Sequence, residues 1–211
     1  MRKLISTSVL TAIAAMLCIG SAQANVITGS LWHVPEAITF NAIPANVPAT
    51  TPDVKFDVNS PMNFFGDSAS VATWLANGAA FNIVENTAGT LTSLMDDGTV
   101  GSLLEFTGFV SVTNGQTFSV THDDGLTLII GGVDLGFSSG PTAPTTSIAT
   151  YTGPTGNFAF QLVYAECCGG PAVLQVDLPF SNTPNNVPEP GTLALLGIAL
   201  AGLGLTRRKP F

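Results

Sequence analysis

Hydrophobic and polar residues alternate along much of the middle of the chain, with the period of two that is typical of half-buried β-strands. Residues 54–58 and 104–112 show this alternation, and a Thr-Asn-Gly-Gln hairpin turn at 113–116 leads into a returning strand at 117–121. Further strands are expected at residues 126–130, 133–135, 147–151, 157–166 and 172–178. Many short strands separated by turns predict an all-β sandwich or barrel.

One stretch departs from the strand pattern and predicts a single short helix. It covers residues 69–76, with Asp67 or Ser68 as N-cap and Asn77-Gly78 as its end. Before it, residues 25–40 are strand-like. The segment from 41 to 52 is rich in Pro, Ala, Asn and Thr, which indicates a loop or an edge. Strands are therefore expected to dominate this part of the chain.

The first 24 residues have the three parts of a secretory signal peptide. Residues 1–3 include Arg and Lys, residues 4–19 are apolar, and residues 20–24 end in an Ala-x-Ala cleavage site. We expect a signal helix that is removed by cleavage after Ala24. A retained membrane helix is the alternative, but Ser and Thr interrupt the apolar run and small residues follow it at once.

The end of the chain carries an uncharged stretch followed by a basic cluster. Residues 191–206 contain no charged side chain, and a helix of this length measures roughly 24 Å. Because the hydrocarbon core of a bilayer is about 30 Å thick, such a helix barely spans it. The basic residues after it would stay on the cytoplasmic side. We therefore expect a hydrophobic helix that serves as a temporary anchor in the inner membrane.

This tail resembles the PEP-CTERM sorting signal of Gram-negative bacteria. The resemblance rests on the apolar helix and on six flanking residues, which are Val187, Pro188, Glu189, Pro190, Arg207 and Arg208. It implies processing by an exosortase-type enzyme, a secreted or cell-surface location, and an association with exopolysaccharide and biofilm. An ordinary C-terminal anchor is the alternative. The expected organisation is a signal peptide at 1–24, a sandwich at 25–180, a linker at 181–186 and a sorting tail at 187–211.

Without its two ends the chain is much more acidic. Of its 14 acidic and 6 basic side chains, 13 acids but only one base, Lys55, lie between residues 25 and 186. This part therefore has a formal charge of −12, against −8 for the whole chain. Such a surface repels phosphate backbones and argues against nucleic acid as a partner. It suits hard cations such as Ca²⁺, which take oxygen ligands.

Three features follow one another between residues 106 and 178. The first is a hairpin with aromatic anchors at Phe109 and Phe118, and the second is the run from Thr121 to Gly132. The third is an alternating strand at 158–166 that leads into Gly-Gly-Pro-Ala. In this order they resemble the PA14 superfamily, which includes the flocculin-type lectin domains of fungal adhesins. The resemblance implies a two-sheet β-sandwich.

In lectin-type members of that superfamily, two adjacent aspartates hold a Ca²⁺ that also binds sugar hydroxyls, often across a cis peptide bond. The resemblance assigns this role to Asp123 and Asp124. Paired carboxylates repel each other unless a cation neutralises them. Lectin members also supply an Asn or Asp from the loop before the last strands, where Glu166 is the nearest carboxylate here. The alternative is a plain Asp-Asp-Gly turn, as we expect at residues 96–98.

Cys167 and Cys168 are the cysteines that remain after the signal peptide, with Cys18, is removed. In an oxidising compartment they favour a vicinal disulfide, which would stiffen the loop facing Asp123. Two buried free thiols, a bound metal and a link between chains are the alternatives. The candidate ligand-binding residues are His122, Glu166, Cys167, Cys168, Gly169 and Gly170. His122 is also a candidate general base, although an isolated histidine is more often a solvated turn residue.

These features favour a non-catalytic, Ca²⁺-dependent carbohydrate-binding module of adhesin type, with extracellular polysaccharide as its partner. The competing class is a structural component of the biofilm matrix that binds no small ligand. A third is a glycan hydrolase that uses Asp123, Glu166 and His122. No nucleophile elbow, HExxH motif or phosphate-binding loop in the sequence supports this third class.

Overall fold

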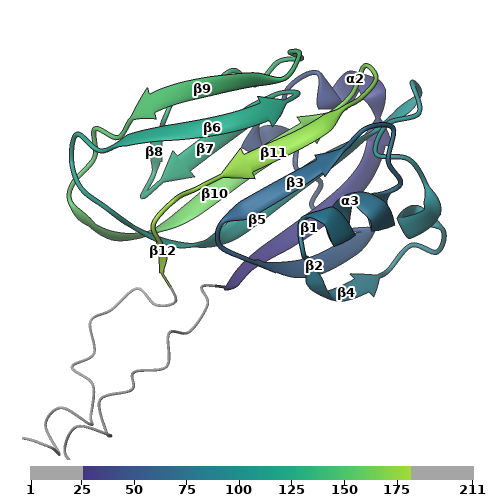
Figure 1. Ribbon diagram of the computed structural model, residues 1–211, viewed down its shortest axis with the longest axis horizontal. Helices are drawn as coiled ribbons and strands as arrows, with labels where there is room; N and C mark the ends of the chain where they lie inside the picture. The colour runs from purple at the N-terminus through teal and green to yellow at the C-terminus, as the bar shows by residue number, and fades with distance from the viewer. Residues whose placement is uncertain (1–25, 182–211) are drawn as a thin grey trace, which may run out of the picture.

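The computed structural model describes residues 26–181, which form two β-sheets packed face to face (Figure 1). The larger sheet has eight strands, in the order β4-β2-β1-β5-β10-β7-β8 with β12 paired to β5. The smaller sheet has four strands, in the order β3-β11-β6-β9. The strand pairs are antiparallel. The predicted all-β, two-sheet sandwich is confirmed.

The strands of the larger sheet are β1 Val26–Pro35, β2 Val54–Asn59, β4 Phe81–Glu85, β5 Val100–Val112, β7 Leu126–Ile130, β8 Val133–Asp134, β10 Gly156–Glu166 and β12 Phe180–Ser181. Those of the smaller sheet are β3 Met62–Gly66, β6 Thr117–Asp123, β9 Thr145–Thr150 and β11 Ala172–Val176. Alternating burial along β2, β3 and β6 shows why these sequences form strands, since every second side chain enters the space between the sheets.

Aromatic side chains fill the middle of the sandwich. The ring of Phe56 meets those of Phe64 and Phe106 edge to face, with centroids 6.2 and 5.7 Å apart. Trp74 stacks on Phe64 at 4.2 Å, and Tyr164 lies parallel to Trp74 at 6.0 Å. This column of rings connects the smaller sheet to β10, and so supports the end of the sandwich where Tyr164 lies.

The described chain has two short α-helices, whereas the sequence predicted one. α3 covers Val71–Asn77 and ends at Gly78, but Ser70 is its N-cap rather than Asp67 or Ser68, because the Ser70 side chain accepts a hydrogen bond from the backbone N–H of Thr73. The additional helix, α2, covers Glu36–Thr39. It interrupts the segment 25–40 that was expected to be a strand. The described residues also include two 3₁₀ turns, Pro44–Asn46 and Thr90–Thr92.

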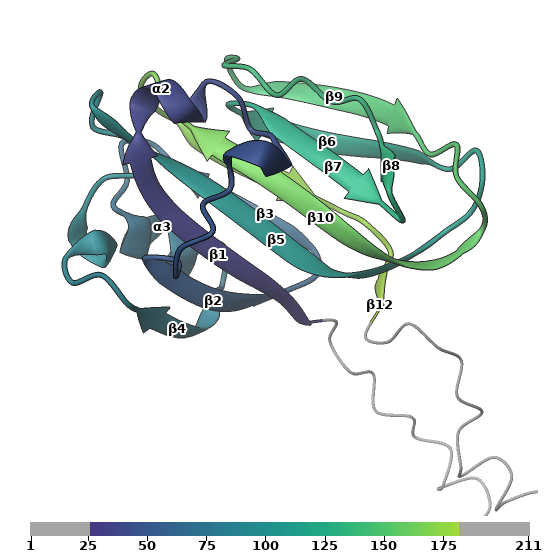
Figure 2. The same cartoon turned by 180° about the vertical axis from the view of Figure 1, so that it is seen from behind.

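The segment after α2 covers part of the outer face of the larger sheet (Figure 2). A second, smaller hydrophobic cluster lies there, with Trp32 and Leu103 on the sheet and Ala42 from the covering segment. Trp32 is only 6% exposed, and Trp74 is fully buried. Both tryptophans therefore belong to the interior.

The predicted signal helix with its cleavage site after Ala24, the hydrophobic C-terminal helix and the sorting motif all lie outside the described residues. The expected linker at 181–186 lies outside them except for Ser181, which pairs with Phe109 in the larger sheet. Within residues 26–181, no helix has the length and apolar character needed to cross a membrane.

Candidate functional site

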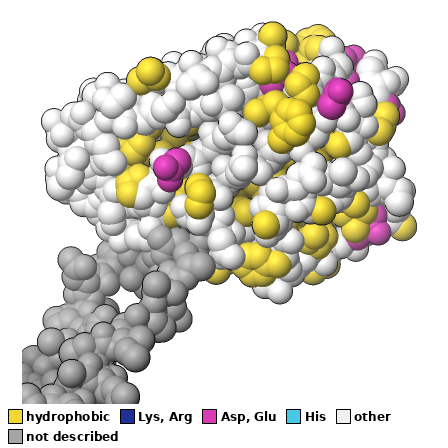
Figure 3. All heavy atoms as spheres, in the orientation of Figure 1, with side chains coloured by type: hydrophobic (Ala, Val, Ile, Leu, Met, Phe, Trp, Pro, Cys, Tyr) yellow, Lys and Arg dark blue, Asp and Glu magenta, His cyan; other side chains and the backbone are white. Residues whose placement is uncertain are grey.

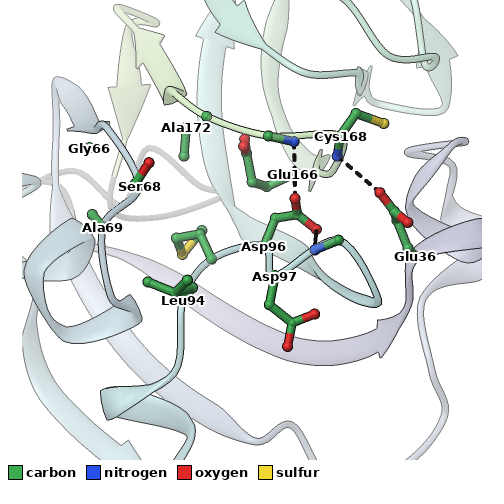
Figure 4. A pocket seen from close by; sticks show the side chains of 14 residues that line it. Glu36, Gly66, Ser68, Ala69, Leu94, Asp96, Asp97, Glu166, Cys168 and Ala172 are labelled. Atoms are coloured by element: carbon green, nitrogen blue, oxygen red, sulfur yellow. Dashed lines mark hydrogen bonds between the residues drawn. The ribbon is translucent and has the colours of Figure 1, made fainter.

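Two adjoining hollows open at the end of the sandwich where β6 ends and β10 turns into β11. The paired-aspartate hollow has a volume of about 380 Å³ and is lined by Asp123, Asp124 and residues 141–144 and 168–171. The second hollow, of about 490 Å³, lies on the other side of residues 168–170, which line both (Figure 4). Glu36, Asp96, Asp97 and Glu166 are among the residues that line this second hollow. Both volumes fall in the usual range for small-ligand sites, roughly 300–1,000 Å³.

Asp123 and Asp124 form the floor of the first hollow. Their side chains are 4% and 3% exposed, and the peptide bond between them is cis. The Asp124 carboxylate accepts hydrogen bonds from the backbone N–H groups of Thr142, at 3.0 Å, and Cys167, at 2.8 Å. It therefore ties the 141–144 loop and the β10–β11 loop to the end of β6.

Burial raises the pKa of both aspartates. The pKa of Asp123 rises to about 7, first because of burial and then because of the charge of Asp124 beside it. Burial also raises the pKa of Asp124, although the N–H groups of Cys167 and Thr142 act against this shift. The two carboxyl groups are close enough for each to shift the pKa of the other. Their mutual repulsion is relieved when they share a proton or when a cation neutralises them.

His122 supports this pair from inside the protein. The side chain is fully buried, its Nδ1 contacts the carbonyl oxygen of Asp124, and its Nε2 lies 2.8 Å from the hydroxyl of Ser147. Because a carbonyl oxygen only accepts, Nδ1 carries the proton and donates. His122 lines neither hollow. The structure thus places this predicted ligand-binding residue behind the aspartates and not at the surface that a ligand would touch.

Glu166 lines the second hollow and not the one that Asp123 and Asp124 line. It is 1% exposed, and its Oε2 is 2.7 Å from the hydroxyl of Tyr164, which also contacts the carbonyl oxygen of Asp123. Burial, followed by the charges of Asp124 and Asp123, raises the pKa of Glu166 to about 9. The Tyr164 hydroxyl is the donor in both contacts.

Cys167 and Cys168 form a disulfide at the tip of the β10–β11 loop. Cys167 is fully buried, whereas Cys168 is exposed and lines both hollows. The sulfur atoms and the Asp124 carboxylate lie within 4.8 Å of one another. Because the sulfurs are joined to each other, they are not the thiolates that a soft metal ion requires.

Three successive backbone N–H groups of this loop each donate to a carboxylate from a different part of the chain. The pairs are Cys167 with Asp124 at 2.8 Å, Cys168 with Glu36 at 3.3 Å, and Gly169 with Asp96 at 3.0 Å. Two of these bonds are drawn in Figure 4. The loop that separates the hollows is therefore held in place by charged side chains that also line them.

Asp96 and Glu36 are residues of the site that the sequence did not indicate. Residues 96–98 do form the expected turn, since Asp96 accepts from the N–H of Gly98, and Gly98 has a positive φ of 79°. Asp96 also reaches Gly169 with its other oxygen. Glu36 lies 132 positions before Cys168. No local pattern could have revealed either contact, because the fold alone brings these segments together.

The end of the chain matches a known sorting signal. Residues 186–209 match the model of the family described as the PEP-CTERM protein-sorting motif. This motif marks proteins that are exported across the inner membrane of Gram-negative bacteria to the cell surface or the extracellular space, and it implies processing by an exosortase. The predicted sorting signal and location are thereby confirmed. A search of curated proteins gives no match.

The described body is similar in fold to solved PA14 domains. A structure titled "PA14 sugar-binding domain from RTX adhesin" has a TM-score of 0.50 and 20% identity, over 74% of this chain and 90% of that one. The PA14 domain of the MpAFP antifreeze protein has a TM-score of 0.48 and 19% identity, over 80% of this chain and 88% of that one. The similarity to the adhesin domain confirms the PA14-like fold that the sequence predicted.

Proposed function

We propose that this exported protein is a non-catalytic module that binds carbohydrate through a Ca²⁺ ion held at Asp123 and Asp124. One observation carries the proposal. Two buried carboxyl groups lie side by side on the floor of an open hollow to which no Lys or Arg of the described chain contributes. Lys55, the one basic residue between positions 26 and 181, lies on β2 and lines neither hollow.

The oxygen atoms around this hollow suit a hard cation. Ca²⁺ takes about 6–8 oxygen ligands from carboxylates, carbonyls, water and ligand hydroxyls. Asp123 and Asp124 would supply carboxylate oxygens, and residues 141–144 and 168–171, which line the same hollow, would supply backbone carbonyls. The ion would neutralise the repulsion between the two carboxylates and would offer its remaining positions to vicinal hydroxyls of a sugar. We extend the proposal to extracellular polysaccharide as the partner, because the protein is exported.

The arrangement gives little support to a glycan hydrolase. His122 is fully buried and both ring nitrogens make contacts within the protein, so it has no free nitrogen for a substrate proton. Glu166 holds its proton at neutral pH and lines the second hollow, whereas Asp123 lines the other one. The acid and the base that such a reaction requires do not face a common substrate position.

Calorimetry with CaCl₂ on the purified protein tests the ion site. We expect the wild type to bind Ca²⁺ and to release it when a chelator is added. Asp123→Asn should bind Ca²⁺ at least about tenfold more weakly, a loss of roughly 1.4 kcal/mol in binding free energy. Asp123→Asn is preferred to Asp124→Asn because Asp124 also holds two loops. Asp134→Asn, which removes an exposed charge on β8, is the matched control and should bind as the wild type does.

A glycan array, read with Ca²⁺ and with chelator, then tests the sugar. Binding that disappears with chelator and in Asp123→Asn supports the proposal. No Ca²⁺ binding, or binding that Asp123→Asn leaves unchanged, would rule out the ion site. Ca²⁺ binding without any bound glycan would instead favour a matrix protein that uses the ion for its own structure.

A further inference from the structure

We infer that the free edge of β9 pairs with the same edge of a second copy of this protein, so that the two smaller sheets join into one continuous sheet. The pairing does not depend on what the hollows bind. β9 is the last strand of the smaller sheet and, in the described part of the chain, it pairs with β6 alone. Figure 1 shows it along the border of the molecule.

The edge of β9 is regular and firmly held. Its six residues, Thr145–Thr150, pair with β6 without a shift in register. The hydroxyl of Thr146 lies 2.9 Å from that of Thr121, and the hydroxyl of Ser147 lies 2.8 Å from Nε2 of His122. In an antiparallel edge strand, every second residue turns its N–H and C=O away from the sheet, where another strand can pair with them. Because β9 is already ordered, such pairing costs little conformational entropy.

The other terminal strands of the two sheets are protected against such pairing. β8 has two residues, one of which is the charged Asp134. β4 carries Glu85 and shifts register against β2. β3 lies against α3, and Asn77 of that helix donates to the backbone carbonyl of Phe65. Short length, charge, irregular pairing and a covering element are the usual ways of protecting an edge. β9 has no charged residue, no proline and no irregularity in its pairing.

The distribution of charge favours a second copy as the partner. Residues 106–121 and 135–165 contain no Asp, Glu, Lys or Arg, although residues 25–186 together carry a formal charge of −12. Figure 3 shows most acidic side chains of this face at its right-hand end and none at the upper left, where β9 ends. Two copies repel each other where their acidic surfaces meet, so they approach most easily along this uncharged edge. A basic partner would instead be attracted to the acidic end.

The side chains of β9 suit a two-fold axis through Ile148. Thr146, Ile148 and Thr150 are exposed, and Ile148, at 71%, is the most exposed large hydrophobic side chain of the described residues. With the axis at this position, the Ile148 side chains of the two copies face each other. Thr146 of each copy then faces Thr150 of the other. Directly opposed β-branched side chains stabilise a strand pair, and an isologous dimer requires a self-complementary surface of this kind.

This pairing would give the dimer two ligand sites that face in different directions. Residues 141–144, which line the paired-aspartate hollow, lead directly into the start of β9. Because the two β9 strands run in opposite directions, the two hollows would lie at opposite ends of the joined strands. On the proposed function, on which this consequence alone rests, the dimer would bind two segments of polysaccharide and cross-link them.

Sedimentation equilibrium of the purified protein in chelator measures the association. A single strand pair is a small interface, so we expect a dimer with a dissociation constant of roughly 1–100 µM. Higher NaCl should tighten the dimer, because salt screens the repulsion between two acidic copies. A protein that remains monomeric at about 1 mM, well above that range, would overturn the inference.

Variants on the two edge strands of the smaller sheet locate the interface. Ile148→Glu and Ile148→Lys each bring two like charges face to face, and each should weaken the dimer at least about tenfold. Phe65→Glu and Phe65→Lys are the matched controls, since Phe65 is 50% exposed on β3, at the other edge of the same sheet. They should dimerise as the wild type does. An unchanged melting temperature would show that each variant is folded.

The two charges at position 148 also separate strand pairing from a general effect of net charge. A dimer that Ile148→Lys strengthens and Ile148→Glu weakens would be governed by net charge, which would overturn pairing at β9. A dimer that the Phe65 variants weaken as much as the Ile148 variants would overturn its placement on this edge.

Cross-linking tests the register and the identity of the partner. With a mild oxidant, Ile148→Cys should form a covalent dimer at least about tenfold faster than Phe65→Cys, because only the former places two thiols opposite each other. Peptide mapping should find the new disulfide between the two introduced cysteines. Equal rates for the two variants, or a new link to Cys168 alone, would overturn the two-fold register.

Ca²⁺ binding separates this inference from the proposed function. Ile148→Glu should bind Ca²⁺ as the wild type does, because Ile148 lines neither hollow. A wild-type dimer that binds no Ca²⁺ would overturn the proposed function and support the pairing. A wild type that binds Ca²⁺ but stays monomeric would overturn the pairing alone.

Discussion

The carboxyl group of Glu166 shows how far burial can change a single side chain. It lies at the end of β10 with 1% of its surface exposed, in contact with Tyr164. Burial, with the negative charges of Asp124 and Asp123, raises its pKa to about 9 from an ordinary 4.5. At neutral pH this carboxyl group therefore keeps its proton, and the site carries one negative charge fewer than its composition implies.

This shift makes stability depend on pH in a defined direction. Between pH 4.5 and about 9 the unfolded chain loses the proton of Glu166 while the folded protein keeps it. The unfolded state is therefore favoured as pH rises, by up to about 1.4 kcal/mol per unit. Glu166→Gln, which cannot ionise, should unfold at higher urea concentration than the wild type at pH 8. The advantage should shrink towards pH 5.

Urea unfolding in chelator at several pH values measures the effect without any contribution from bound ions. Glu85→Gln, an exposed glutamate on β4, is the matched control and should follow the wild-type pH dependence. Parallel pH profiles for Glu166→Gln and the wild type would contradict the assignment of a buried proton to Glu166.

Gly29 on β1 is a position where only a hydrogen atom fits. A Cβ there would overlap the ring of Phe56, which is packed against Phe64 and Phe106. Gly29→Ala should therefore destabilise the fold by about 1–3 kcal/mol through overpacking. Gly140→Ala is the control, since its Cβ would meet one atom at 3.9 Å. Equal urea midpoints for the two variants would mean that the core can yield at Phe56.

At the scale of elements, most strands were predictable from the sequence, but β3, β4 and β12 were not. The predicted strands at 54–58, 104–112, 117–121, 126–130, 133–135, 147–151, 157–166 and 172–178 correspond to β2, β5, β6, β7, β8, β9, β10 and β11. β4 escaped prediction because it is exposed along nearly its whole length and has no alternation of burial. α2 escaped because it has four residues and no side-chain cap.

The site was predictable only in part, for a related reason. Its Asp-Asp pair and its adjacent cysteines are neighbours in sequence, so a local pattern could reveal them. Glu36 and Asp96 join them only through the packing of α2 and the 94–98 turn against the β10–β11 loop. His122 could not be placed correctly, because its burial depends on β9, whose Ser147 meets its ring.

The start of α3 gives a prediction at the same scale. Ser70 caps the helix by accepting from the N–H of Thr73, at 3.3 Å. Ser70→Ala should reduce the free energy of unfolding by about 1 kcal/mol, because one N–H of the first turn loses its partner. Asp67→Ala and Ser68→Ala remove the side chains that the sequence suggested as caps. These two variants should lower the free energy of unfolding by no more than about 0.5 kcal/mol in the same urea titration, as surface substitutions usually do.

At the scale of the whole molecule, the distribution of charge matters more than any single ion pair. Thirteen acidic side chains and one lysine lie between residues 26 and 181. Self-repulsion of this kind destabilises the compact state and is screened by salt. The same surface would concentrate cations around the two hollows.

Thermal unfolding separates general screening from a specific ion site. Raising NaCl from low to moderate concentration should increase the melting temperature. The increase should be roughly 2–4 °C for each ~1 kcal/mol gained in the free energy of unfolding. At constant ionic strength, CaCl₂ at about 100 times the dissociation constant of Ca²⁺ should raise the free energy of unfolding of the wild type by about 2.7 kcal/mol. The reason is that a ligand that binds only the folded state stabilises that state. Asp123→Asn should keep the response to NaCl and lose the response to Ca²⁺. If NaCl reproduces the stabilisation by Ca²⁺, or if Asp123→Asn retains it, then Ca²⁺ acts by screening the acidic surface and not by binding to the paired aspartates.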